Sequence, residues 1–378
     1  MFTPTYKKDI GLYIHIPFCT KKCHYCAFAV VTDNSRMDEY VEKLIFELEE
    51  KLKWVKENNR TIYTIYFGGG TPSTLTITLL AKILEKIDLK NVEELSIECN
   101  PEDVTLEYIS SLKNLGFHRI SLGVQTLQTS LLKSINRSHD SLQATNAMYI
   151  LQEAGISWNA DIILGLPHSD SKNTIFDIEK ILEFGPGHIS LYFYTKEKSS
   201  VFGHQKNLGI PKEKDLMQTY DKICILLKQK GYIQYEFSNW AKSDYESKHN
   251  LMNWLGMEYI GVGMSASSFF DNQSAENPAN LNIYLKNSLH QNVTPYTQKD
   301  MAIRYIMLGL RLETGVTIDC ISEFLTSTQI DSLVASIADS HLSKVVVISG
   351  THMYLTPEGR LFHSSIVDFL YDEVMKMN

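Results

Sequence analysis

The strongest constraint on the fold is a regular alternation of short apolar runs with longer amphipathic segments over the first half of the chain. The apolar runs are rich in β-branched and aromatic residues, as strands are, and the longer segments repeat apolar residues at helical spacing. Strands that alternate with helices pair in parallel, because each crossover helix returns the chain to the same end of the sheet. The six predicted strands cover residues 12–16, 61–67, 95–98, 119–124, 157–163 and 188–193.

Helices are expected between these strands. Ser35 and Asp38 have the spacing of a capping box that opens the first helix. Gly116 and Gly155 stand where two helices should end, because glycine tolerates the left-handed conformation of a helix C-cap. The predicted helices run from residue 35 to residue 55 and near residues 79–87, 106–115, 142–154 and 174–182.

Polar or glycine residues recur at the carboxyl end of each predicted strand, where a barrel of parallel strands places its functional groups. The alternation fits both an open six-stranded sheet and a partial (β/α)6 barrel resembling a TIM barrel. The repeated polar ends favour the partial barrel. They comprise three cysteines after the first strand, the glycines at 68–70, Glu98 and Asn100, Gln125, Asp161, and Tyr192 and Tyr194.

The alternation stops after the sixth strand. A helix is predicted at residues 215–231, and the polar residues 272–282 are predicted to form a loop. Residues 299–378 are predicted to form a small α+β domain that resembles a winged helix, with a hairpin around Ser349 and Gly350. The expected division is a barrel over 1–200, a barrel extension or linker over 201–298, and the C-terminal domain over 299–378.

Charge argues against nucleic acid as a partner. The chain carries 36 Lys and Arg against 44 Asp and Glu, a net charge of −8. A winged helix raises the question of DNA binding, but residues 300–378 hold five basic and ten acidic side chains. Because phosphate binding needs a basic surface, we expect no nucleic-acid partner.

The expected location is the cytoplasm. The chain holds no run approaching the roughly 20 apolar residues of a membrane span. Residues 1–9 lack the apolar segment of a secretion signal.

Three of the six cysteines, Cys19, Cys23 and Cys26, lie within eight positions on the loop after the first predicted strand. This spacing lets three thiolates each bind one iron of a [4Fe–4S] cluster, which leaves the fourth iron open to a small molecule. A zinc site that recruits His15 or His24 is one alternative. A disulfide with one free thiol is the other, and a cytoplasmic location argues against it.

The segment from Tyr13 to Cys26, Tyr-Ile-His-Ile-Pro-Phe-Cys-x3-Cys-His-Tyr-Cys, resembles the radical S-adenosylmethionine (SAM) superfamily. The resemblance implies that the three cysteines hold a [4Fe–4S] cluster, that SAM binds the open iron, and that reduction leads to cleavage of SAM. Tyr25 matches the aromatic position of the motif, which in the family lies against the adenine. Tyr13 and Tyr25 are therefore assigned to cofactor binding.

The same resemblance assigns further residues to the SAM site. Gly69, Gly70 and Thr71 belong to a loop whose carbonyl groups suit the ammonium group of SAM, since glycine lets the backbone approach a ligand closely. Glu98 would accept hydrogen bonds from the ribose hydroxyls. The alternatives are an ordinary flexible turn for the loop and a buried ion pair for Glu98. The other residues assigned to this pocket, with packing as the alternative, are Gln125, Arg137 and Asp161.

Within the superfamily, the chain most resembles the group around oxygen-independent coproporphyrinogen III oxidase, and within that group the HemW family of haem chaperones. Two features separate it from the oxidases. Phe28 occupies the position of their additional cysteine, and only 18 residues precede Cys19, where the oxidases carry a longer extension. Decarboxylation of coproporphyrinogen is therefore not expected.

The segment from His249 to Trp254 resembles the haem-binding motif His-Asn-x-x-Tyr-Trp of HemW-like proteins, with Asn253 in place of the tyrosine. Imidazole is a common axial ligand of haem iron, so His249 is the expected ligand. Trp254 would offer an apolar face to the porphyrin. The alternative is a structural histidine at the start of a helix.

The resemblance implies a haem chaperone that binds a [4Fe–4S] cluster, SAM and haem, and that transfers haem to acceptor haemoproteins. No residue is assigned a catalytic role. The alternative is a radical SAM enzyme that abstracts hydrogen from a porphyrinogen. A homodimer and a peripheral association with a membrane are further expectations.

Overall fold

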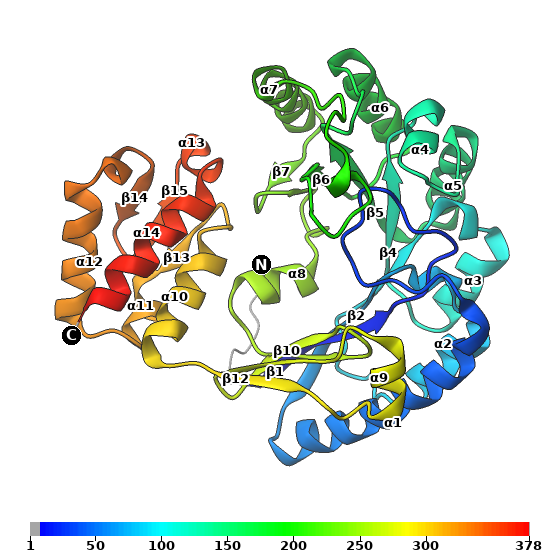
Figure 1. The fold of residues 1–378 in the computed structure, drawn as a ribbon, viewed down its shortest axis with the longest axis horizontal. Helices are drawn as coiled ribbons and strands as arrows, with labels where there is room; N and C mark the ends of the chain where they lie inside the picture. Colours follow the sequence, from blue (N-terminus) through cyan, green and yellow to red (C-terminus); the bar gives the residue numbers. More distant parts are fainter. Residues whose placement is uncertain (1–7, 378) are drawn as a thin grey trace.

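The computed structural model describes residues 8–377 of the 378-residue chain. Its central feature is a set of six parallel strands in chain order, joined by helices on the outer face of the sheet (Figure 1). The six predicted strands are confirmed, each within three residues at either end. They are β1 (Asp9–Ile16), β2 (Thr61–Gly69), β3 (Glu94–Cys99), β4 (Arg119–Gln125), β5 (Ser157–Leu164) and β6 (His188–Phe193).

The crossover helices lie where helical spacing predicted them, but the predicted capping box is wrong. A short 3-10 turn at Asn34–Arg36 precedes the first helix, and Asp33 caps this turn by accepting a hydrogen bond from the amide of Ser35. Ser35 therefore cannot cap the helix itself, which begins at Met37. The helices are α1 (Met37–Glu57), α2 (Ile77–Leu84), α3 (Leu106–Asn114), α4 (Thr129–Ser134), α5 (Ser141–Ala154), α6 (Ser171–Glu183) and α7 (Glu213–Gln229).

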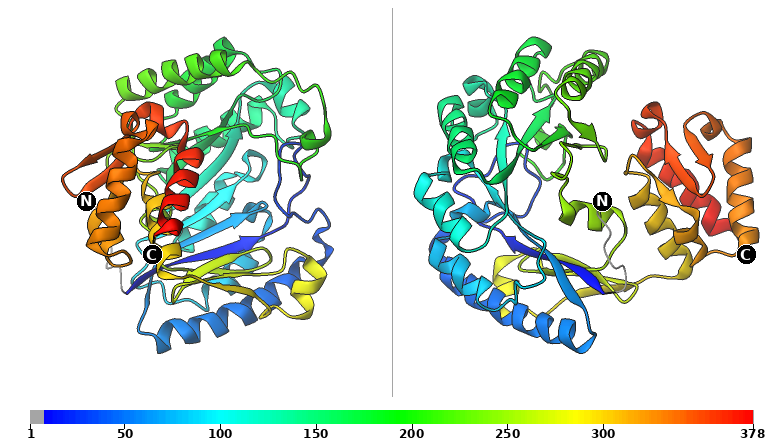
Figure 2. Two further views of the ribbon diagram at one scale, coloured as in Figure 1. Left: turned by 60° about the vertical axis from the view of Figure 1, so that its left-hand side comes forward. Right: turned by 180° about the vertical axis from the view of Figure 1, so that it is seen from behind.

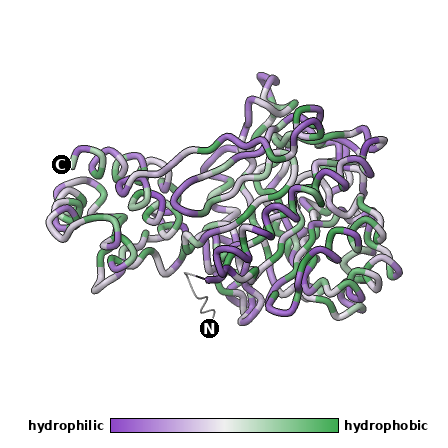
Figure 3. Tube along the Cα trace, turned by 90° about the horizontal axis from the view of Figure 1, so that it is seen from below, coloured by the Kyte–Doolittle hydropathy of each residue, from purple (hydrophilic) through white to green (hydrophobic). Residues whose placement is uncertain are grey.

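The two glycines predicted to end helices do so. Gly155 has φ 61° and is the C-cap of α5, and Gly116 follows the last turn of α3 with φ 91°. Each lets the chain turn from a helix into the next strand, because glycine alone enters this conformation without steric cost. Apolar side chains of the strands and helices then form one continuous core. Along the trace, the hydrophobic residues that supply this core alternate with hydrophilic ones (Figure 3).

Residues after β6 extend the sheet at both edges. Two short antiparallel strands follow β6, and four strands extend the edge at β1, the first of them parallel to it. The predicted loop at 272–282 is wrong, because it contains a strand whose side chains are largely polar and of which only Ala275 is buried. These elements are β7 (Ile233–Gln234), β8 (Asn239–Ala241), α8 (Lys248–Trp254), β9 (Tyr259–Val262), β10 (Ser267–Phe270), β11 (Gln273–Glu276), α9 (Leu281–Lys286) and β12 (Asn292–Pro295).

The complete sheet of the described residues runs in the order β12-β11-β10-β9-β1-β2-β3-β4-β5-β6-β8-β7. Within the described chain, its edge strands β12 and β7 do not pair with each other, so the barrel is partial and stays open on one side. The C-terminal part of the chain lies at this open side (Figures 1 and 2).

The C-terminal domain has its own apolar core and a small antiparallel sheet of order β13-β15-β14. The predicted hairpin around Ser349 and Gly350 is confirmed by the pairing of its last two strands. The elements are α10 (Gln298–Gly309), β13 (Val316–Thr317), α11 (Ile318–Ser322), α12 (Ser327–Asp339), β14 (Val346–Ser349), β15 (His352–Leu355), α13 (Pro357–Arg360) and α14 (His363–Lys376).

None of the helices in residues 8–377 is long and apolar enough to cross a membrane. The expectation that the first nine residues lack a secretion signal rests mostly on residues 1–7, which lie outside the described residues. The division of the chain after residues 200 and 298 stays a proposal.

Candidate functional site

The carboxyl ends of the six parallel strands surround a cavity of about 640 Å³, which we call the cysteine cavity. Parallel strands bring the residues that follow them to one rim, as the sequence predicted. Eleven of the thirteen predicted site residues line this cavity, namely Cys19, Cys23, Tyr25, Cys26, Gly69, Gly70, Thr71, Glu98, Gln125, Arg137 and Asp161.

The loop that carries the three cysteines is held at both ends by backbone hydrogen bonds. The amide of Cys19 donates to the carbonyl of Val31 (2.9 Å), and the amide of His24 donates to the carbonyl of Ile135 (3.0 Å). The imidazole of His24 also bonds to the carbonyl of Ser134 through Nδ1 (2.9 Å). The loop is thus positioned by contacts to the strand and helix elements around it.

The alternatives to a cluster receive no support from the loop. All six cysteines are free, so the predicted alternative of a disulfide with one free thiol does not form. His24 bonds to a backbone carbonyl, and Nδ1 of His15 bonds to the hydroxyl of Tyr13 (3.1 Å). Both histidines of the zinc alternative use Nδ1 in a hydrogen bond, while Nε2 of His15 is buried and has no partner among the described residues. Nowhere in residues 8–377 do three or more His, Cys, Asp or Glu side chains gather so that they could hold a metal ion, and this includes Cys19, Cys23 and Cys26, so this finding favours neither zinc nor a cluster.

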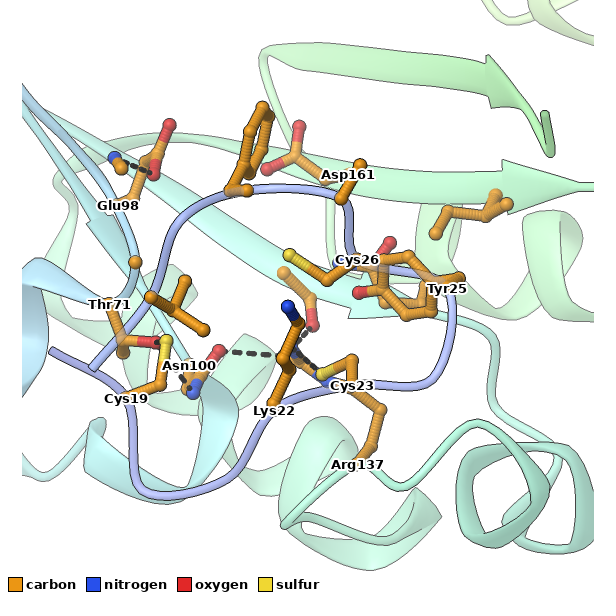
Figure 4. Close-up of a pocket in the computed structure, with 18 of the residues that line it drawn as sticks. Cys19, Lys22, Cys23, Tyr25, Cys26, Thr71, Glu98, Asn100, Arg137 and Asp161 are labelled. Atoms are coloured by element: carbon orange, nitrogen blue, oxygen red, sulfur yellow. Dashed lines mark hydrogen bonds between the residues drawn. The ribbon is translucent and has the colours of Figure 1, made fainter. Parts of the chain in front are cut away.

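Two of the three thiols accept hydrogen bonds from side chains of the barrel (Figure 4). Thr71 Oγ1 donates to Cys19 Sγ (3.3 Å), and Arg137 Nη1 donates to Cys23 Sγ (3.6 Å). Burial raises the pKa of Cys19 to about 11 and also raises the pKa of Cys26. Thiolates in such a place need positive charge close by, which bound iron supplies and the guanidinium of Arg137 reinforces.

Arg137 is fixed by two further acceptors. Its Nη2 donates to Asn100 Oδ1 (2.7 Å) and to the carbonyl of Gly123 (2.9 Å). Its Nε is buried and has no partner among the described residues. The residue therefore links the ends of β3 and β4 to the cysteine loop. It does not merely pack, which was the alternative.

Two partly buried carboxylates, Glu98 and Asp161, face the same cavity. Glu98 accepts hydrogen bonds from the Tyr66 hydroxyl (3.0 Å) and from the Gly69 amide (3.1 Å). Asp161 accepts hydrogen bonds from Ser121 Oγ (2.7 Å) and from the side-chain amide of Asn159 (2.8 Å). Burial, together with the charge of Asp161, raises the pKa of Glu98 to about 7, and burial raises that of Asp161. Within the described part of the chain neither forms an ion pair, so the pair suits a cationic ligand that carries hydroxyl groups.

The glycine loop after β2 packs directly against the cysteine loop. A Cβ atom at Gly70 would lie 2.7 Å from the carbonyl carbon and oxygen of Pro17, and Gly69 has φ 114°. Only glycine fits at position 70, because a side chain there would collide with the backbone of Pro17. Only glycine fits at position 69, because its positive φ is strained for other residues. The loop is thus a close approach between two segments of the cavity wall and more than a flexible turn.

The two remaining predicted residues, Tyr13 and His249, do not line the cysteine cavity. They line a second cavity of about 880 Å³ between the inner side of the barrel and α10, which we call the His249 cavity. Phe28 borders both cavities and is 64% exposed. The structure therefore separates the predicted site residues into two neighbouring places.

His249 lies in the first turn of α8, and a buried carboxylate fixes that turn. Both oxygens of Glu94 accept hydrogen bonds there, from the amides of Lys248 (3.0 Å) and His249 (3.2 Å) and from Ser247 Oγ (3.3 Å). A carboxylate at this end of a helix satisfies amides that have no partner within the helix. The position of His249 is therefore determined by β3 as well as by α8.

The imidazole of His249 is oriented by a buried hydroxyl. Its Nδ1 lies 2.8 Å from Thr64 Oγ1, and this hydroxyl donates its proton to the sulfur of Met252 (3.4 Å). In the tautomer with the proton on Nδ1, the ring would donate to this hydroxyl and Nε2 would keep its lone pair. Burial lowers the pKa of His249 to about 4, so the ring is neutral at neutral pH. A neutral imidazole with a free lone pair is what binding to iron requires.

Aromatic rings form part of the wall between the two cavities. Tyr66 stacks on His249 with ring centroids 5.2 Å apart and on Tyr13 with centroids 6.3 Å apart. Its hydroxyl reaches Glu98 in the cysteine cavity. Sequence reasoning did not single out Tyr66, because an aromatic residue inside a strand gives no signal beyond packing.

The other wall of the His249 cavity also escaped sequence reasoning. It comes from β9–β12 and from α10, which provide Tyr259, Phe269, Tyr296 and Arg304. These residues belong to segments that the sequence left unassigned or placed in another domain. Only the pairing of β9 with β1 brings them near His249.

Comparisons with known proteins agree with the arrangement of the chain. The model of the radical SAM superfamily matches residues 13–181, and that of the HemN C-terminal domain matches residues 296–362. Coproporphyrinogen III oxidase (HemN) from Escherichia coli has a similar structure, with a TM-score of 0.82 and 22% identity over 97% of this chain and 90% of that one. At this level of identity the similarity shows the fold alone.

Similarity of sequence goes further. The protein named "Heme chaperone HemW" in Lactococcus lactis is 33% identical over 97% of this chain and 99% of its own length. The protein of the same name in Bacillus subtilis is 30% identical over 94% of this chain and 97% of its length. That in Escherichia coli is 33% identical over 68% of this chain and 69% of its own. The chain therefore belongs to the HemW family of the radical SAM superfamily.

Proposed function

We propose that the protein is a haem chaperone, which binds a [4Fe–4S] cluster, SAM and haem and transfers haem to acceptor haemoproteins in the cytoplasm. The observation that carries the proposal is the neutral, oriented imidazole of His249 beside a cavity large enough for a porphyrin. Membership of the HemW family supports the same reading.

The thiolates of Cys19, Cys23 and Cys26 would hold the cluster. When bound and reduced, a cluster of this kind supplies the electron for cleavage of SAM. Thr71 and Arg137 would donate hydrogen bonds to the thiolates, which disperses their charge and stabilises the bound cluster.

The remainder of the cysteine cavity would bind SAM. Glu98 and Asp161 would accept hydrogen bonds from the hydroxyl groups of the ligand and attract its cationic group. A bound cation would in turn stabilise the ionised form of the two carboxyls, which burial disfavours. Tyr25 and Gln125 line the same space and would contact the adenosine part. Tyr13 takes no direct part in this proposal, since it borders the other cavity.

Haem would occupy the His249 cavity, with Nε2 of His249 as an axial ligand of the iron. Trp254 and Phe269 give the cavity apolar surface for a porphyrin face. Asn253, which stands where the family motif has tyrosine, also lines this cavity. The substitution therefore changes the wall of the site and not the ligand.

A second candidate is a radical SAM enzyme that acts on a porphyrinogen. It is favoured by the complete set of thiol, arginine and carboxylate groups around the cysteine cavity. An anaerobic assay with reductant, SAM and coproporphyrinogen separates the two functions. Release of carbon dioxide that is lost in Cys23→Ser would contradict the chaperone proposal.

A homodimer and a peripheral membrane contact belong to the same proposal and rest on family resemblance. Analytical ultracentrifugation and liposome flotation test them.

The function itself is tested by transfer of haem. Protein loaded with haem should release it to an apo-haemoprotein, and the acceptor should then show the absorbance of its own haem-bound form. Loaded protein that retains its haem in the presence of every apo-haemoprotein tried would contradict transfer.

A further inference from the structure

The C-terminal domain contributes a buried positive charge to the wall of the His249 cavity. Arg304 lies on α10 and is 7% exposed. Its Nη1 donates to the carbonyl of Gly256 (2.8 Å), and the guanidinium lies over the ring of Phe269, 3.5 Å from the centroid. Among the described residues it forms no other hydrogen bond and no ion pair.

Two carboxylates in the neighbourhood of Arg304 have other partners. Glu258 is bonded to Arg60 (2.7 Å). Asp300, one helical turn before Arg304, also lines the cavity and accepts hydrogen bonds from the amide and the hydroxyl of Thr297 at the start of α10. The other groups around the guanidinium are phenols, namely Tyr259, Tyr296 and Tyr305.

A buried guanidinium stays charged and therefore costs free energy unless an anion compensates it. Other arginines of this region meet that requirement within the protein. Arg311 reaches Glu236 (3.2 Å), and Arg360 pairs with Glu313. Arg304 differs from them, because the surface that it borders is the cavity.

Further hydrogen-bonding groups of the same wall are also unused. Nε1 of Trp254 and Oγ of Ser265 are buried and have no partner among the described residues, although both side chains border the cavity. An indole nitrogen can only donate. Apart from Asp300, whose carboxylate caps α10, the wall therefore offers a positive charge and spare donors, set among apolar and aromatic surfaces such as Phe269 and Met307.

This combination selects a ligand with a flat apolar body and a carboxylate. On the basis of the proposed function, we propose that Arg304 binds a propionate carboxylate of the haem in the His249 cavity. Haem would then be held from two sides, by His249 of the barrel and by Arg304 of the C-terminal domain. The C-terminal domain is thus part of the haem site.

Haem and haem dimethyl ester, in which both propionates are blocked, provide the test. Each is titrated into the full-length protein carrying its reconstituted cluster, and binding is followed by visible absorbance. The wild type should bind haem about tenfold or more tightly than the ester, because a hydrogen bond between charged groups is worth that much. Arg304→Gln should weaken haem binding by about tenfold or more and leave ester binding nearly unchanged.

A matched control is Arg360→Gln, which removes a guanidinium of the same domain that already has a carboxylate partner. It should not alter the preference for haem over the ester. Arg304→Lys keeps the charge and should restore part of the preference.

The outcomes separate this inference from the proposed function. If the wild type binds haem and its ester equally well, the role of Arg304 is overturned even if the variants fail to fold. Equal weakening of both ligands in Arg304→Gln also overturns it, because that change would reflect lost packing on Phe269. If the wild type binds neither ligand, the proposed function itself fails.

Discussion

The cysteine cavity and the His249 cavity adjoin each other but differ in their functional groups and in origin. The first is lined by thiols, by carboxylates and by basic side chains, and most of its residues lie on the cysteine loop or at the ends of six consecutive strands. The second is lined by imidazole, indole and guanidinium groups and by the carboxylate of Asp300, and its walls come from segments that are far apart in the sequence. The thiols of the first suit a metal cluster, and the imidazole and guanidinium of the second suit a ligand that carries iron and a carboxylate.

The largest effect is expected from removing one thiolate. Cys23→Ser should abolish the cluster, because two remaining thiolates cannot hold three irons. Iron content and visible absorbance after reconstitution measure the loss. Haem binding should stay within about threefold of the wild type, because His249 keeps all its contacts. Cys224→Ser, which removes a thiol on α7, is the control and should retain the cluster.

The next effect is a dependence of stability on pH. The native Glu98 carboxyl keeps its proton up to about pH 7, whereas an unfolded glutamate loses it near pH 4.5. Between about pH 4.5 and pH 7 the native state thus binds more protons than the unfolded state. The contribution of Glu98 to the free energy of unfolding therefore falls as the pH rises through this range, by up to about 3 kcal/mol.

Denaturant unfolding of the apo-protein at pH 5 and pH 8 measures this change. Glu98→Gln should remove that part of the pH dependence and stabilise the apo-protein at pH 8. Thr105→Ala, which removes the cap of α3, is a control that should destabilise the protein equally at both pH values. An unchanged pH dependence in Glu98→Gln would show that the carboxyl is ionised in the apo-protein.

Removal of the imidazole should act on the other cavity alone. His249→Ala should weaken haem binding by about 100-fold and change the spectrum of the bound haem, since a ligand of the iron is lost. Cluster content and SAM affinity should not change. His363→Ala removes another partly buried histidine, bonded to the carbonyl of Met307, and should leave the haem spectrum as it is. An unaltered spectrum in His249→Ala would refute the ligand assignment and leave haem uptake standing.

The smallest effect concerns the wall between the cavities. Tyr66→Phe removes the hydroxyl that donates to Glu98 but keeps the ring that stacks on His249. SAM affinity should fall by at most about fivefold, because Glu98 would lose a donor that orients it toward the ligand. Haem affinity should hold within about twofold. Isothermal titration calorimetry with SAM and with haem measures the two affinities. If Tyr66→Phe lowers both affinities equally, the two cavities are not independent.

Much of the cysteine cavity could be predicted from sequence, because local signals specify it. Strand periodicity, the cysteine spacing and the glycine loop each lie within a few residues, and parallel strands bring their ends together. The partial barrel and the hairpin of the C-terminal domain followed from the same signals.

The His249 cavity could not be predicted in this way. β11 carries mostly polar side chains and has one buried residue, so its sequence does not show the alternation of a strand. Arg304 lies on a helix whose sequence shows an apolar face, and its burial depends on Phe269 and Gly256. Such contacts form only when distant strands join the sheet. The predicted cap of α1 was wrong for a local reason. A 3-10 turn at Asn34–Arg36 precedes the helix, which therefore begins at Met37.

The central claim is that the His249 cavity takes up haem independently of SAM chemistry. The most direct measurement is a titration of the cluster-reconstituted protein with haem, with and without SAM, followed by optical and EPR spectra. We expect one haem per chain and a spectrum that changes in His249→Ala. Uptake only in the presence of SAM would contradict the independence of the two cavities, and a wild-type protein that takes up no haem under either condition would contradict the proposed function.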